Sequence, residues 1–352
     1  MPDPGSVVLP VYFVGVFQDP NGNQLHEAGE PAWIYGAPGP VPIGADRYSE
    51  LLDAQLSTSS RELPPDLVAA FRHARGGRGL VALKTDDDVP VVAGEIADLE
   101  ATRFSVEAGT EGLWQPVTFL AKNGIGVFFL EPYDPQRVPV LFVYGAGGSP
   151  QNFRLFFEKL DRKKYQAWFF LYPSGLRLAE SSRVLGRVID VLHEKLAFPR
   201  LEVVAHSMGG LVARRFLLDA AAQRQPWVHD FVTLSTPWNG HPAAALGVEY
   251  APAVIPSWRD MEVGSPFTSD LFETRLAPPV TYCLGFTFHG EHKMGLPENN
   301  DGAVGVSSEL RSEAQDEAVQ MRGFDETHTG VLKSAAASDF IESCLAREAK
   351  PD

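Results

Sequence analysis

The chain has 352 residues, of which 44% are hydrophobic and 21% are charged, a composition typical of globular proteins. Its net charge of -15 disfavours nucleic-acid binding, because phosphates need cationic partners, and no apolar run is long enough to cross a membrane. The two cysteines, Cys283 and Cys344, have no metal-like spacing, so neither a metal nor a cofactor is predicted.

The N-terminal third is rich in proline and glycine and has little helical periodicity. The pattern predicts strands over residues 7–17 and 89–99, and short helices over residues 49–55 and 65–74. The first of these runs contains Pro10 and has no basic flank, so it is not a signal peptide. We therefore expect a cytoplasmic protein, or an exported one whose signal has been removed.

Residues 112–133 predict two strands joined at Asn123-Gly124, a strong hairpin dipeptide. We expect this hairpin to form the antiparallel edge of a larger sheet. Residues 1–105 would then be a β-rich accessory region, and residues 106–352 the main domain.

Strand-like and helix-like patterns alternate from residue 138 onward. Apolar runs predict buried strands over residues 138–144 and 166–172, and further strands are predicted over residues 201–206, 231–235, 280–286 and 318–324. Helical spacing of apolar residues predicts helices over residues 153–160, 179–196, 208–222 and 330–345. This alternation is typical of an α/β protein with a doubly wound, mostly parallel sheet.

The alternation stops over residues 236–279, a segment too long for a plain loop. It is rich in proline and contains Trp238, Trp258 and Phe267. We expect a lid of short helices here. Its aromatic side chains would either bind an apolar substrate or form the core of the lid, and the sequence leaves both open.

The segment Ala205-His-Ser-Met-Gly209 joins a β-branched run directly to a helical pattern. A strand, a tight turn with a serine at its apex and a helix form a nucleophile elbow, which makes Ser207 the candidate nucleophile. His206 would point away from the site.

A serine nucleophile needs a base, and the base needs an orienting acid, in the chain order serine, acid, histidine. His328 follows the last predicted strand and is the expected base. Asp301, in an Asp-Gly turn, is the expected acid, with Glu291 and Asp325 as rivals.

The oxyanion hole needs two backbone amides. Met208, directly after the nucleophile, supplies one. The glycine-rich loop Tyr144-Gly-Ala-Gly-Gly148 follows the first buried strand and offers the amide of Ala146. This loop lacks the Gly-Lys-Ser/Thr ending of a phosphate-binding loop.

These segments together resemble the α/β-hydrolase lipases and esterases, including bacterial lipases and deacylases of glycosylphosphatidylinositol anchors. The loop at Tyr144 is similar to the His-Gly-x-Gly-Gly oxyanion loop of that family, with tyrosine in place of histidine. Thr233-Leu-Ser-Thr-Pro-Trp-Asn-Gly240 is similar to the stretch that opens its lid, and Thr327-His-Thr-Gly330 resembles its base loop. The resemblance covers residues 124–345.

The resemblance implies a serine ester hydrolase that forms an acyl-enzyme with a hydrophobic acyl group. An acyltransferase with the same triad, or an inactive binding protein on this scaffold, remains open. The expected partner is a small-molecule or lipid ester. Contact with a membrane surface and the oligomeric state are left open.

Overall fold

The computed structural model describes residues 11–12, 14–17, 32–35, 41–42, 91–222, 227–250, 254–291, 296 and 299–347. The chain divides into two compact units, Met1–Asp88 with Val248–Val254, and Val89–Gly247 with Ile255–Asp352. The helices expected over residues 49–55 and 65–74 lie outside the described residues.

The described part of the first unit consists of two short antiparallel pairs, β1 with β4 and β2 with β3. These strands are β1 (Val11–Tyr12), β2 (Val14–Phe17), β3 (Ala32–Tyr35) and β4 (Val41–Pro42). Whether residues 1–105 act as an accessory region stays a prediction.

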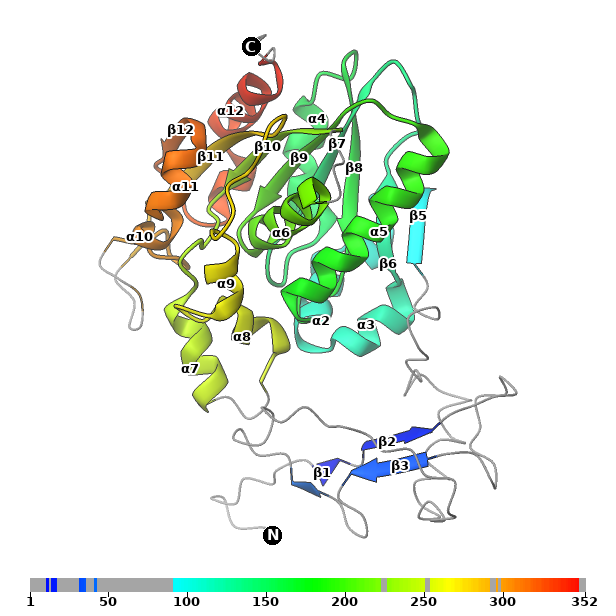
Figure 1. Ribbon diagram of the computed structural model, residues 1–352, viewed down its shortest axis with the longest axis vertical. Coiled ribbons are helices and arrows are strands. Elements are labelled where there is room, and N and C mark those ends of the chain that lie inside the picture. The colour runs from blue at the N-terminus through cyan, green and yellow to red at the C-terminus, as the bar shows by residue number, and fades with distance from the viewer. Residues whose placement is uncertain are drawn as a thin grey trace. The chain divides into compact units, whose positions relative to one another are not determined.

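The second unit is built on an eight-stranded sheet with the order β12-β11-β10-β9-β7-β8-β6-β5 (Figure 1). All neighbours are parallel except β6 and β8, which are antiparallel. The strands are β5 (Val91–Ile96), β6 (Ile125–Phe129), β7 (Val138–Val143), β8 (Tyr165–Leu171), β9 (Leu201–His206), β10 (Val228–Leu234), β11 (Thr281–Thr287) and β12 (Ala318–Phe324). The expected mostly parallel sheet is confirmed.

Helices cover both faces of this sheet (Figure 1). They are α2 (Val106–Trp114), α3 (Pro116–Asn123), α4 (Arg154–Lys159), α5 (Leu178–Leu196), α6 (Met208–Ala222), α7 (Pro242–Tyr250), α8 (Pro256–Met261), α9 (Pro266–Asp270), α10 (Val306–Glu309), α11 (Ser312–Glu317) and α12 (Ala335–Leu345). α5 and α6 pack against each other, and α12 packs against α4.

The central strands form because their apolar runs are buried on both faces. Every residue of β8 and β9 is buried, including the polar Gln166 and Glu202. α5 buries Leu185, Val188 and Ile189 on one face, as its helical spacing predicts. Parallel strands align their carboxyl ends at one edge of the sheet, so the loops that follow them lie close together.

The expected strand pair over residues 112–133 is wrong in its first half. Ser105 caps α2, because its hydroxyl accepts the amide of Ala108, and Pro116 occupies the first turn of α3. Gly124 takes a φ of 72° and its amide donates to Leu120, so the Asn-Gly pair ends a helix instead of turning a hairpin. The second half forms β6, and β5 lies outside it as the edge strand.

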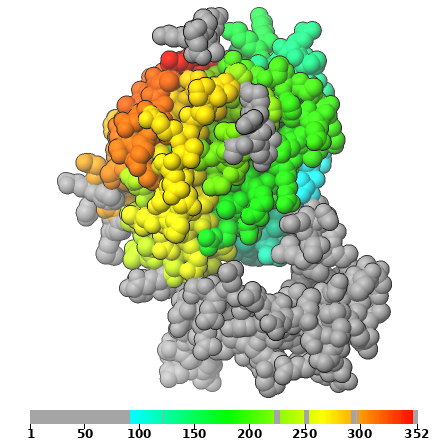
Figure 2. All heavy atoms as spheres, viewed as in Figure 1, coloured from blue at the N-terminus to red at the C-terminus, as the bar shows by residue number. Residues whose placement is uncertain are grey.

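The segment after β10 contains the short helices α7, α8 and α9, as expected for residues 236–279. Figure 2 shows the stretch from α8 to β11, in yellow, as a continuous strip on one face of the second unit. None of the helices among the described residues is long and apolar enough to span a bilayer.

Candidate active site

Ser207 occupies a sharp turn between β9 and α6. Its φ is 54°, a strained value for a residue with a side chain, and its amide donates to Leu234 at 2.9 Å. A Cβ at Gly209 would lie 2.3 Å from the carbonyl oxygen of Val143, so only glycine lets α6 start this close to β7. The turn has the geometry expected of a nucleophile elbow.

His328 lies in the loop after β12 and bridges Ser207 and Asp301. Its Nε2 is 2.8 Å from the Ser207 Oγ, and its Nδ1 is 2.6 Å from the Asp301 Oδ2. The His328 backbone amide also donates to the carbonyl of Asp301 at 2.8 Å, which fixes the two loops to each other. Three residues far apart in the sequence are thus brought together in the predicted order.

Asp301 is fully buried and accepts four hydrogen bonds. Its Oδ1 accepts the amides of Ala303 and Val304, and its Oδ2 accepts the Thr287 hydroxyl at 2.7 Å and His328. Burial alone would raise the pKa of Asp301. The hydrogen bond and charge of His328, with the Val304 amide and Thr287 hydroxyl, outweigh burial and hold that pKa well below its ordinary value.

The rival acids lie elsewhere in the structure. Asp325 pairs with the exposed His289 at 2.9 Å, and Glu291 is itself exposed. Of the three carboxylates considered, Asp301 is the one that contacts His328.

His206 has a structural role, as expected, but its contact with the base loop was not predicted. Burial lowers the pKa of His206 to about 3, so the ring is neutral, and its Nε2 donates to the carbonyl of His328 at 2.8 Å. The two rings pack with centroids 4.9 Å apart. No sequence signal besides its position next to Ser207 marks this residue.

The glycine-rich loop after β7 lies against the elbow. A Cβ at Gly145 would be 2.7 Å from the Cβ of Ser207, so Ala146 follows at the point where the chain passes the nucleophile. No hydrogen bond in the described part of the chain uses the Ala146 amide. Met208 is the first residue of α6, so its amide has no acceptor within the helix. The assignment of the Ala146 and Met208 amides as oxyanion donors stays a prediction.

Tyr144 braces this loop in place of the histidine of the lipase motif. Its hydroxyl donates to the carbonyl of Tyr172 and accepts the Tyr172 amide, and the Tyr172 hydroxyl donates to the carbonyl of Tyr144. The two rings stack with centroids 4.8 Å apart, and both are buried. This reciprocal pair ties the carboxyl ends of β7 and β8 together.

The three aromatic residues of the lid segment are buried to different extents. Trp238 is fully buried and packs on Phe231, Phe272 and Tyr282, which makes it part of the core. Trp258 and Phe267 are half-buried and pack against the hydrophobic core.

A cavity of about 490 Å³ lies beside the same segment, and its lining includes Asn239, Gly264, Ser307 and Arg311. Neither Ser207 nor His328 lines it, so it is adjacent to the candidate site and separate from it.

The comparisons with known proteins concern the fold. A family model described as "Alpha/beta hydrolase of unknown function (DUF915)" matches residues 176–253. No curated protein matches the chain.

Solved structures with a similar fold include two lipases. Lipase B of Aspergillus fumigatus is 19% identical with a TM-score of 0.50, over 64% of this chain and 57% of that one. The mature lipase BlEst2 of Bacillus licheniformis is 18% identical with a TM-score of 0.49, over 62% of this chain and 97% of that one. The chain therefore has the α/β-hydrolase fold.

Proposed function

We propose that this chain is a serine ester hydrolase with Ser207 as nucleophile, His328 as base and Asp301 as acid. The observation that carries the proposal is the continuous contact from Asp301 through the two ring nitrogens of His328 to the Ser207 hydroxyl. Asp301 accepts the Nδ1 hydrogen, so the tautomer that leaves Nε2 free to take the serine proton is favoured.

In the first half of the reaction, Ser207 Oγ bonds to the ester carbonyl carbon while His328 takes its proton. The electron pair of the carbonyl moves to oxygen, where the amides of Ala146 and Met208 would bind it. The intermediate then collapses to an acyl-enzyme, and His328 gives the proton to the departing alcohol. Water, activated by His328, releases the acid and restores Ser207.

An aromatic pair of one exposed and one half-buried tryptophan, on α2 and α8, supports a hydrophobic acyl group as the substrate. Trp258 packs edge-to-face on Trp114, with centroids 5.6 Å apart, and Trp114 is 57% exposed. α2, which carries Trp114, packs on the oxyanion loop so closely that a Cβ at Gly109 would lie 2.3 Å from the Gly148 carbonyl. An acyl chain that extends from Ser207 toward α2 would contact these apolar rings. A lipid ester at a membrane surface has such an acyl chain.

The test is hydrolysis of p-nitrophenyl esters from acetate to palmitate, with Ser207→Ala as the control. We expect kcat/KM to rise with chain length and to vanish in the control. A fluorophosphonate should label Ser207, mapped by mass spectrometry. Labelling at Ser149 or Ser235 would contradict the assignment, and an absence of both hydrolysis and labelling would contradict the proposed function.

A further inference from the structure

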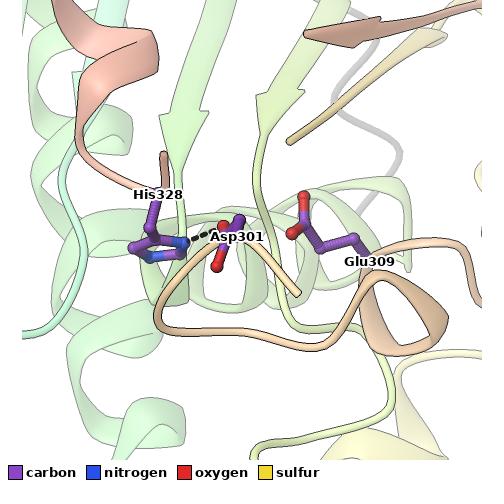
Figure 3. Close-up of side chains that lie close together, drawn as sticks. All are labelled: Asp301, Glu309 and His328. Carbon is purple, nitrogen blue, oxygen red and sulfur yellow. Dashed lines mark hydrogen bonds and ion pairs between the residues drawn. The ribbon is translucent and has the colours of Figure 1, made fainter. Parts of the chain in front are cut away.

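A second carboxyl group lies beside Asp301, and the proposed reaction does not use it. Glu309, the last residue of α10, is buried. One ligand atom each of Asp301, Glu309 and His328 lies within 4.8 Å of the others. Figure 3 shows the Glu309 side chain extending from its helix toward Asp301, on the side away from His328.

The two carboxyl groups are unequally supplied with hydrogen-bond donors. Asp301 accepts four, whereas Glu309 accepts the amide of Thr287 at its Oε2, 3.0 Å away. The Oε1 of Glu309 is buried and has no partner among the described residues. Two buried carboxylates this close cannot both be ionised at low cost. The negative charge is therefore more stable on Asp301, which accepts more hydrogen bonds. This arrangement favours an ionised Asp301 and a protonated Glu309.

Among the described residues, Asp301 and His328 each have a ligand atom within 4.8 Å of one on Glu309, β11 contributes the neutral Thr287, and α10 has no other titratable residue. The Nη atoms of Arg311 donate to the carbonyls of Trp238 and Thr268 and to Glu313, and its Nε is buried without a hydrogen-bond partner among the described residues. Burial, together with the negative charge of Asp301, raises the pKa of Glu309 well above its ordinary value.

We propose that Glu309 is a positioning residue that stays neutral beside ionised Asp301 and supplies the negative charge near His328 when residue 301 carries no charge. In the native protein Glu309 accepts the backbone amide of Thr287 and so fixes this residue. The side-chain hydroxyl of Thr287 in turn donates to Asp301 and orients it. The inference rests on the proposed function, since it assigns Glu309 a part in the same site.

The distances alone would also suit a divalent cation, and the structure argues against that use. A metal ion would need both carboxyl groups deprotonated and would have to take the Nδ1 of His328 from Asp301. The proposal therefore predicts that a chelator leaves the activity of the native protein intact.

The first experiment compares Asp301→Asn, Glu309→Gln and the double variant across pH. Gln keeps an acceptor for the Thr287 amide, so Glu309→Gln alone measures the structural cost. After that cost is divided out, we expect the kcat/KM of Asp301→Asn to match that of the double variant at the low end of the pH range and to exceed it by about tenfold or more at the high end, as Glu309 ionises. A ratio that does not change with pH, or activity lost to the chelator, would overturn the proposal.

The second experiment does not depend on ester hydrolysis. Infrared spectra of the Ser207→Ala protein should show a protonated carboxyl band at neutral pH that Glu309→Gln removes, and that titrates at lower pH when Asp301→Asn is added. If the band is present but the native chain hydrolyses no ester, the proposed function fails and the neutral state of Glu309 stands. If the band is missing, or insensitive to Asp301→Asn, the inference on Glu309 fails whatever the chain hydrolyses.

Discussion

Replacing Tyr144 by phenylalanine tests whether the stacked tyrosine pair holds the oxyanion loop. The change keeps the buried ring and removes one hydroxyl. That hydroxyl donates to the carbonyl of Tyr172 and accepts its amide at 2.8 Å, so both backbone groups would be left without partners in a buried site. An unsatisfied buried polar group costs about 1–3 kcal/mol, so the two groups together predict a loss of about 2–6 kcal/mol in unfolding free energy.

Urea denaturation followed by far-UV circular dichroism measures this loss, and kcat/KM on a p-nitrophenyl ester measures its effect on the site. Tyr172→Phe is the matched control, because it removes the single hydrogen bond to the carbonyl of Tyr144. It should cost about half as much stability. We expect Tyr144→Phe to lower kcat as well, since Ala146 lies two residues further along the same loop. A change of less than about 0.5 kcal/mol, the usual range for a neutral surface substitution, would refute the reasoning.

Further substitutions test the site and its surroundings. Ser207→Ala should lower kcat by about a million-fold with folding unchanged, as measured by ester hydrolysis and circular dichroism. Asp301→Asn should cost about ten-thousand-fold in kcat near pH 7, because His328 loses the partner that fixes its tautomer; a loss below about tenfold would remove Asp301 from the triad. A polar residue at Trp258 should reduce kcat/KM for palmitate esters more than for acetate esters, whereas equal losses would indicate a folding defect. Burial and the charge of Asp230 raise the pKa of Glu202 to about 7. The folded protein therefore favours the protonated form of Glu202, and the stability this contributes is lost as pH rises from about 4.5 through 7. Glu202→Gln should flatten this fall in unfolding free energy, as measured by urea titrations across pH.

The sheet and its order of elements were predictable because they follow from local patterns. Each apolar run from residue 138 onward became a strand within a few residues of its predicted bounds, and the spacing over residues 179–196 became α5. The hairpin predicted over residues 112–124 was wrong because an Asn-Gly pair is found both in hairpin turns and at the ends of helices. Gly124 ends α3 with a positive φ, and the cap at Ser105 that favours helix lies outside the stretch that predicted a hairpin.

The contacts of Ser207, His328 and Asp301 follow from their chain order and from the position of each after a strand. The residue type of Trp238 did not show whether its side chain binds substrate or belongs to the core. An aromatic residue in a proline-rich segment suits a binding face and a core equally, and the neighbours that decide, Phe231 and Tyr282, lie on β10 and β11. Glu309 could not be found at all, because a glutamate in a short polar helix gives no sign of burial before its neighbours are known.

The aligned carboxyl ends of the strands explain why the site has more polar members than its motifs suggest. Ser235 follows β10 with the same φ of 54° as Ser207 after β9, and its hydroxyl lies 2.8 Å from that of Thr287 at the end of β11. The Thr287 hydroxyl donates to Asp301, so Ser235 must donate to Thr287, and a line of hydrogen bonds runs across two strands to the proposed acid. Parallel strands place one such residue after another at a single edge. A sequence shows that polar residues lie at the ends of β10 and β11, but only the register of these two strands determines which of them meet.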